Sequence, residues 1–201
     1  MGVQPTMRLP GIDSADDFNA AARRGRWPML CDPGCTFTYP LLHELFLLWH
    51  ELAGPGDIPY RRDFNARRLR AYMKSLVIYE RVDEGGRTRY RVRLMGSSLA
   101  AVVGELTGRY LDEAAGEKYL PRWYALIEAV LSARAPLRML SRSDAFDKSY
   151  LTGEFLGAPL RADDDTVKLV LAMGHYDGTR SWTDVATEEC RRLGLEPLGI
   201  L

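Results

Sequence analysis

Two neighbouring apolar stripes mark residues 41–53 as the strongest predicted helix in the chain. They follow the three- and four-residue spacing of helix faces and comprise Leu42, Leu45, Phe46, Trp49 and Ala53, and Leu41, Leu45, Leu48 and Leu52. An apolar arc this wide exceeds one ordinary contact face. The helix is therefore either buried in its own domain, or it covers that domain on one side and a partner on the other. The second alternative predicts a homodimer interface formed by Leu42, Leu45, Phe46 and Trp49.

Apolar runs and alternating positions predict five strands further along the chain. The segments are residues 76–82, 89–94, 137–142, 150–160 and 167–176. The first two flank the turn residues 83–86 and predict a β-hairpin. In the second strand Tyr90, Val92 and Leu94 alternate with arginines, so we expect these three on one face. The last strand is apolar on both faces at 169–173, which is typical of a central position in a sheet.

Helices are predicted between the hairpin and the last three strands. The segments are residues 98–103, 111–115 and 119–133, of which the third is the longest. Residues 1–40 are expected to form an N-terminal arm, in which Ser14 and Asp17 resemble a helix-capping box. Residues 27–40 are rich in Pro, Gly and Cys and predict a loop. Residues 177–201 predict a C-terminal tail with one short helix at 187–192.

The gross composition narrows the class of protein. The chain has 201 residues, 46% of them hydrophobic, and a formal net charge of zero. We therefore expect a globular domain with no global field that attracts nucleic acid or an anionic membrane. No run of eighteen apolar residues and no N-terminal apolar segment occurs, so neither a membrane span nor a secretory signal is predicted. The three cysteines form no paired framework, which favours a reducing compartment and a cytoplasmic location.

Three stretches give the chain a resemblance to a known family. They are residues 58–65 (IPYRRDFN), 91–97 (RVRLMGS) and 104–113 (GELTGRYLDE). Together with the element order they resemble a bacterial family of short, stand-alone PAS-like proteins. Asn65-Ala66 departs from the family, in which Asp-Pro tends to follow the phenylalanine. Asn65 still caps a helix, so that helix start is expected to be intact.

The resemblance implies an α+β fold. It implies a PAS-like five-stranded antiparallel sheet with helices on one face and a leading helix, over residues 41–176. It further implies a sensory or regulatory domain that binds a small ligand or a partner protein and signals through homodimer packing. The ligand and any cofactor are left open. A ligandless protein-interaction module is the alternative, because the same apolar side chains can simply fill a core.

A ligand cavity would be lined by the concave face of the sheet and the helices above it. Apolar walls with a few polar groups are typical of small-molecule sites. The expected ligand-binding residues are Tyr90, Val92, Leu94, Thr107, Arg109, Trp123, Ile127, Met139, Phe155 and Met173. Thr107 and Arg109 could meet a ligand anion; alternatively, the glycines of this stretch serve tight turns and Arg109 forms an ion pair.

Other chemistries find little support in the sequence. No nucleophile elbow, Walker loop or dinucleotide fingerprint occurs, so we expect no enzyme and no catalytic residues. The cysteines lie outside the predicted sensory core, and residues 96–136 contain no histidine, which disfavours flavin-adduct and haem sensing. A zinc site remains an alternative, although its two histidines lie two helical turns apart, a separation that hinders binding of one metal ion by both. Its candidate ligands are Cys31, Cys35, His43 and His50.

One region departs from neutrality. Residues 60–93 hold eleven Lys or Arg against four Asp or Glu. Such a face can contact phosphates, so a polyanion or nucleic-acid binder acting through residues 61–93 is a further alternative. Base recognition would need aromatic residues among the arginines, and the hairpin pattern places them on the other face. The sequence therefore favours a solvated or ion-paired basic face over nucleic-acid binding.

Overall fold

The structure is a computed structural model that describes residues 11–55, 57–114, 116–143 and 150–197. Within these residues one antiparallel sheet has the strand order β1-β4-β5-β6-β2-β3. The strands are β1 (Met29–Asp32), β2 (Leu76–Glu84), β3 (Arg87–Met95), β4 (Leu137–Arg142), β5 (Thr152–Arg161) and β6 (Val167–Asp177). The α+β, PAS-like fold expected from the sequence is confirmed, with its five strands in place and β1 added as a sixth.

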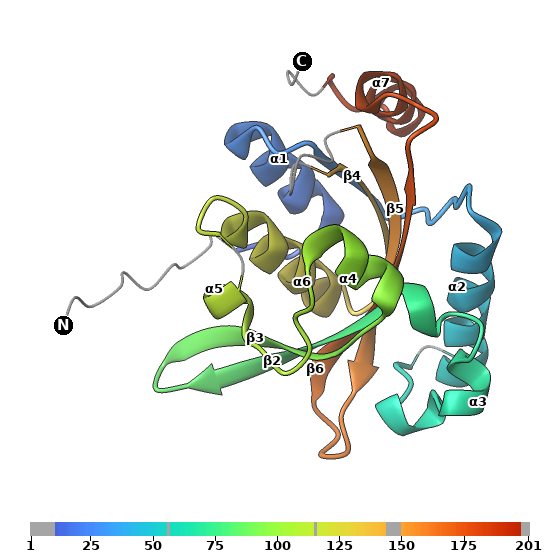
Figure 1. Cartoon of the computed structure of the whole chain (residues 1–201), viewed down its shortest axis with the longest axis vertical. Coiled ribbons are helices and arrows are strands. Elements are labelled where there is room, and N and C mark those ends of the chain that lie inside the picture. The colour runs from blue at the N-terminus through green and yellow to red at the C-terminus, as the bar shows by residue number, and fades with distance from the viewer. Residues whose placement is uncertain (1–10, 56, 115, 144–149, 198–201) are drawn as a thin grey trace.

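Helices cover both faces of the sheet (Figure 1), which corrects the expectation of helices on one face. The first face carries α1 (Ala15–Gly25), α4 (Ser97–Val103), α5 (Leu111–Ala114) and α6 (Leu120–Ala133). The second face carries the leading helix α2 (Pro40–Ala53), α3 (Ala66–Leu69) and α7 (Trp182–Leu193). Short 3-10 turns, η1 (Arg61–Asp63) and η2 (Met73–Ser75), connect α2 to β2. No helix in the described ranges is long and apolar enough to cross a membrane.

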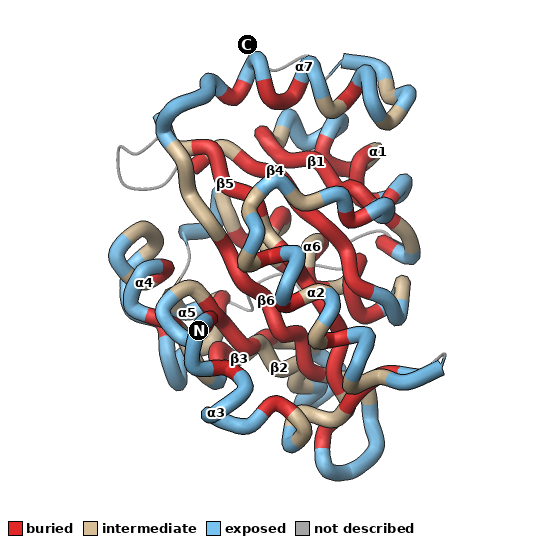
Figure 2. Tube along the Cα trace, turned by 90° about the vertical axis from the view of Figure 1, so that its right-hand side faces the viewer, coloured by how far each residue is buried: buried red, intermediate tan, exposed pale blue. Residues whose placement is uncertain are grey.

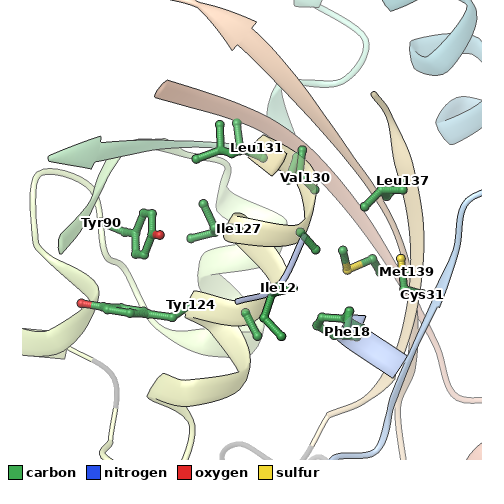
Figure 3. Packing of buried hydrophobic residues seen from close by; sticks show 14 of the residues in the cluster. Ile12, Phe18, Cys31, Tyr90, Tyr124, Ile127, Val130, Leu131, Leu137 and Met139 are labelled. Carbon is green, nitrogen blue, oxygen red and sulfur yellow. The ribbon is translucent and has the colours of Figure 1, made fainter. Parts of the chain in front are cut away.

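Apolar side chains form a separate cluster under each group of helices. The first lies between the sheet and α1 and α6, where Phe18, Ile127 and Met139 pack together (Figure 3). The second lies under α2 and α3, and the third under α7. Buried residues run along the central strands, whereas the outward sides of the helices are exposed (Figure 2). The sheet is therefore the partition between two sides of the core.

The N-terminal segment contributes to this core. Part of the predicted loop at 27–40 is strand β1, which pairs with β4 from Met29 opposite Ser141 to Asp32 opposite Arg138. Helix α1 packs on β1 and α6 and buries Phe18 completely. Ser14 caps this helix by accepting a hydrogen bond from the Asp17 backbone N–H, as its spacing predicted. Three apolar residues and one aspartate between two prolines are too short to show a periodicity, so the strand depends on its partner β4.

A β-bulge in the hairpin changes which residues share a face. Ile78 pairs with Leu94, and the next residue, Tyr79, pairs with Val92, so Arg93 has no partner in β2. An extra residue in one strand rotates the following side chain to the other face. Leu94 therefore packs with the cluster under α2, while Val92 packs under α6. The expectation that Tyr90, Val92 and Leu94 lie on one face is wrong for Leu94.

Helix α2 is held by its own domain. Leu42, Leu45 and Trp49 are buried against the sheet, and the Trp49 indole N–H donates to the Pro159 carbonyl at 2.8 Å. Phe46 is half-buried at the edge of the same cluster. These burials answer the question that the sequence left open. The three buried residues are core residues of the single chain, which corrects their assignment to a homodimer interface.

Candidate functional site

A cavity of about 110 Å³ lies between the first face of the sheet and helices α4 and α6. Its walls are mainly apolar and are supplied by all six strands of the sheet and both helices. The side chains that line the cavity include Met29, Val77, Tyr79, Met95, Leu99, Arg122, Trp123, Leu126, Ile127, Met139, Ser141, Phe155, Ala172 and Tyr176. Apolar walls with few polar groups are the usual composition of a small-molecule site.

Strand register divides the floor of the cavity into three rows. In the first row Ser141 of β4 and Tyr176 of β6 lie on either side of Gly153 of β5. The second row contains Met139 and Phe155. The third row is Gly157, Ala172, Val77 and Met95, across strands β5, β6, β2 and β3. Ser141 and Tyr176 thus lie at one end of the floor, and the row at the other end is apolar.

The ring of Phe155 lies over two glycines, Gly174 in its own row and Gly153 in the first row. A Cβ at Gly174 would lie 2.4 Å from Phe155 Cε1, and a Cβ at Gly153 would lie 2.4 Å from Cε2. Any side chain at these positions would push the ring away from the sheet. Glycine there lets Phe155 lie low, where its ring also meets Tyr176 edge-on at a centroid distance of 5.3 Å. Phe155 therefore forms an apolar floor next to the polar row.

The polar end combines a phenol, a hydroxyl and a guanidinium. Burial raises the pKa of Tyr176 to about 12, and the nearby positive charge of Arg122 opposes that rise. Burial likewise raises the pKa of Tyr79, which lines the cavity from β2. Both phenols therefore stay protonated at neutral pH and can donate hydrogen bonds. Arg122 is buried on α6, with its guanidinium 4.6 Å from the centroid of the Tyr119 ring.

The residues expected from the sequence divide into three groups. Trp123, Ile127, Met139 and Phe155 line the cavity. Tyr90 and Val92 are buried beside it in the same cluster, but they do not contribute to its wall. Leu94 and Met173 lie on the second face of the sheet, so their placement in the cavity is wrong.

The predicted anion contacts lie away from the cavity. Thr107 and Arg109 are exposed on the segment before α5. Arg109 donates to the Glu113 carbonyl at 3.0 Å, and the Thr107 N–H donates to Glu105 Oε1 at 2.8 Å. This geometry fits a turn at Thr107, and the expected ion pair of Arg109 is replaced by a hydrogen bond to a backbone carbonyl.

Sequence reasoning missed the polar end. Ser141 follows Met139 by two positions on β4, so strand alternation places both on the cavity face. Tyr176 follows Gly174 in the same way on β6. Arg122 adjoins Trp123 on α6 but was passed over because arginines are mostly exposed. Strand alternation alone could have found the first two.

Two buried phenols lie beside the cavity without satisfied hydroxyls. The rings of Tyr90 and Tyr124 meet edge-on with centroids 4.6 Å apart (Figure 3). Neither phenol oxygen has a hydrogen-bond partner in the described part of the chain. An unsatisfied buried hydroxyl costs about 1–3 kcal/mol. The two unsatisfied hydroxyls therefore lower the stability of the folded chain, and packing elsewhere offsets this loss.

Tyr124→Phe is expected to raise the free energy of unfolding by about 1 kcal/mol, because it removes a hydroxyl that gains nothing in the folded chain. Tyr60→Phe is the control, since the Tyr60 hydroxyl donates to Asp165 and its loss should lower stability slightly. Urea denaturation followed by circular dichroism measures both variants. A lowered stability for Tyr124→Phe would show that its hydroxyl is satisfied.

A buried ion network lies on the second face, directly behind the cavity strands. The Arg138 guanidinium is 2.6 Å from Glu154, 3.2 Å from Asp32 and 3.0 Å from Glu189. Although burial opposes its charge, hydrogen bonds to Glu189 and Glu154 raise the pKa of Arg138. Glu154 also accepts the backbone N–H groups of Thr38 and Tyr39 at 2.9 and 2.8 Å, at the start of α2. The network thus joins β1, β4 and β5 to both α2 and α7.

Strand alternation couples this network to the cavity. Arg138 precedes Met139 on β4, and Glu154 precedes Phe155 on β5. Successive side chains on a strand point to opposite faces. A displacement of either cavity residue therefore moves the backbone that carries a network residue.

The basic hairpin face is largely matched by carboxylates. Arg89 binds Asp112 and Glu113 of α5 at 2.7 and 2.6 Å. Arg91 and Arg93 share Glu80 of β2 at 2.8 and 3.0 Å. These pairs occupy charges that a polyanion would need, so they weigh against the nucleic-acid alternative.

The zinc alternative gains nothing from the structure. Burial raises the pKa of Cys31 and raises that of Cys35 to about 12, so both thiols are protonated at neutral pH. Zinc binds the thiolate form. Across the described segments, no three His, Cys, Asp or Glu side chains gather in a way that could hold a metal ion.

The comparison with protein families agrees with the fold. A family model described as a PAS domain matches residues 38–174. A comparison with curated proteins gave no match. An RNA-binding light-oxygen-voltage receptor is 16% identical, with a TM-score of 0.42, and the match covers 70% of this chain and 40% of that receptor.

Two further solved structures are similar. The LOV domain of the blue-light photoreceptor Aureochrome1, in its light state, is 13% identical, with a TM-score of 0.40, covering 64% of this chain and 98% of that domain. A light-oxygen-voltage domain with a flavin analogue is 15% identical, with a TM-score of 0.40, covering 64% and 92%. At this level the similarities support no conclusion about a ligand.

Proposed function

Because the chain belongs to the PAS domain family, we propose that it is a non-catalytic sensory or regulatory domain that binds one small molecule between α6 and the sheet. The observation that carries this proposal is the cavity of about 110 Å³ with polar groups gathered at one end. A core that is merely packed holds few voids larger than a water molecule. The free, buried cysteines support a reducing compartment such as the cytoplasm.

Cavity size limits the ligand. An apolar protein cavity of about 150 Å³ binds benzene, so about 110 Å³ suits a single small ring or a short chain. Flavin and haem are several times larger. The ligand in this proposal is therefore a small organic molecule.

The ion network behind the cavity supplies an output route. Ligand contact at Met139 or Phe155 would shift β4 and β5, and with them Arg138 and Glu154. Ligand binding would then change the relative populations of two packings of α2 and α7 against the sheet. The homodimer stays a prediction. If the dimer interface includes α2, it must use the outward side of this helix, where Leu47 is 52% exposed.

Ala172→Leu is expected to abolish small-molecule binding while the domain stays folded. Ala172 lies in the apolar row of the cavity floor, and three additional carbons would occupy the space above it. Benzene is the probe, and its effect is followed by the methyl NMR shifts of Ile127 and Met139, which line the cavity. The shifts should move in the wild type and in the control Ala66→Leu, which is exposed on α3. Unchanged wild-type shifts would contradict the proposed binding site.

A further inference from the structure

We propose that the cavity selects a compact apolar molecule that carries one carboxylate group; this inference rests on the proposed small-molecule sensor and names its ligand class. Three donors from three elements form the polar end: Arg122 of α6, Ser141 of β4 and Tyr176 of β6. The far row of the floor is apolar, and Tyr79 of β2 adds a single phenol to the wall. A molecule with one polar head and one apolar body fits this division.

Strand register fixes the spacing of two of the donors. Ser141 and Tyr176 are both opposite Gly153, so they are separated by two inter-strand steps. Each step is about 4.8 Å, which places the two Cα atoms about 10 Å apart. Gly153 has no side chain, and the low ring of Phe155 fills the floor between them. The two hydroxyl-bearing side chains can therefore approach one head group from opposite sides.

Charge at the polar end favours an anion. Arg122 lines the cavity, and its positive charge lies close enough to Tyr176 to oppose the rise in the pKa of that phenol. Arginine donates and never accepts hydrogen bonds, and its five N–H groups allow it to bind a ligand carboxylate in addition to contacts within the chain. Tyr176 remains a donor at neutral pH because of its high pKa. Charge-assisted hydrogen bonds of this type are about twice as strong as neutral ones.

The apolar rows accommodate the body of the ligand. Val77, Ala172 and Met95 form the far row, and Ile127 of α6 lies above them. A cavity of this size takes a single ring or a short alkyl chain. Benzoate and hexanoate therefore serve as probes of the predicted class. Benzyl alcohol and hexan-1-ol have nearly the same shapes without the carboxylate.

Isothermal titration calorimetry of the full chain at neutral pH compares the two members of each pair. Each acid is expected to bind roughly 10- to 100-fold more tightly than its alcohol, the ratio that a charge-assisted contact gives. Arg122→Met should weaken acid binding much more than alcohol binding, because the acid loses a charge-assisted hydrogen bond and the alcohol loses only a weaker one. Arg122→Lys should restore part of the preference. Tyr176→Phe, a conservative change that keeps the ring, should weaken acid binding by a smaller factor.

Arg109→Met is the matched control, since Arg109 is an exposed arginine outside the cavity. It should leave the affinity for both acids unchanged. Equal affinities within each pair, or loss of acid binding in Arg109→Met alone, would overturn the carboxylate inference and leave the sensor proposal standing. Failure of all four probes would also overturn the inference. Failure of the proposed sensor shows separately, as the absence of benzene-induced shifts at Ile127 and Met139.

Discussion

Arg138→Ala is expected to lower the free energy of unfolding by about 3–5 kcal/mol, the usual cost of removing one partner from a buried ion network. The Arg138 side chain is only 2% exposed, and its removal leaves Asp32 and Glu154 buried without their main counter-charge. Because Glu189 loses its link to β4, α7 should also detach from the sheet more easily. Guanidinium denaturation measures the stability loss, and hydrogen exchange of α7 measures the detachment.

Arg62→Ala provides the comparison for this variant. Arg62 lies 3.6 Å from Asp163 in an ion pair whose side chains are 57% and 85% exposed. Exposed pairs contribute about 0–1 kcal/mol, so the control should keep nearly the stability of the wild type. A loss below about 1 kcal/mol for Arg138→Ala would show that the network is much weaker than its burial indicates.

Leu45→Glu is expected to prevent folding at ordinary temperature. Leu45 belongs to α2 and is fully buried on the side of the helix that faces the sheet. Truncating such a leucine alone costs about 2–5 kcal/mol, and an unpaired carboxylate in the same place adds a desolvation penalty. Circular dichroism should show loss of the native spectrum. Size-exclusion chromatography should show an expanded or aggregated chain.

Leu47→Glu, two residues along the same helix, is the matched control. Its side chain is 52% exposed, so the change should alter stability by no more than about 0.5 kcal/mol. A Leu45→Glu variant that remained folded, and that converted a dimer into a monomer, would contradict the core assignment. It would instead support the interface alternative for α2.

The elements that could be predicted from sequence are those with strong local patterns. The hairpin of β2 and β3 follows from alternation around a Gly-Gly turn, and α6 follows from one apolar stripe. Helix α7 was predicted only at 187–192, but it begins at Trp182 after the cap Ser181. Its apolar contacts with Leu30 and Leu140 stabilise the additional turns, and those partners are distant in sequence.

The features that sequence reasoning missed depend on distant partners. The bulge at Arg93 shows only in the pairing of β3 with β2, and it moves Leu94 out of the cavity. Arg138 looks like an exposed strand residue until Asp32, 106 positions away, is placed beside it. The apolar wall of the cavity was partly predicted because apolar periodicity marks buried faces. At its polar end, strand alternation marks Ser141 and Tyr176 but not their role, and Arg122 carries no comparable signal.

The most direct test of ligand binding is native mass spectrometry of the chain after incubation with the small-molecule fraction of the cells that produce it. The wild type is expected to retain one small molecule, which is released when the protein is denatured. Ala172→Leu, whose added side chain fills the cavity, should show only the mass of the protein. An unmodified mass for both proteins would contradict the proposal that the cavity is a ligand site.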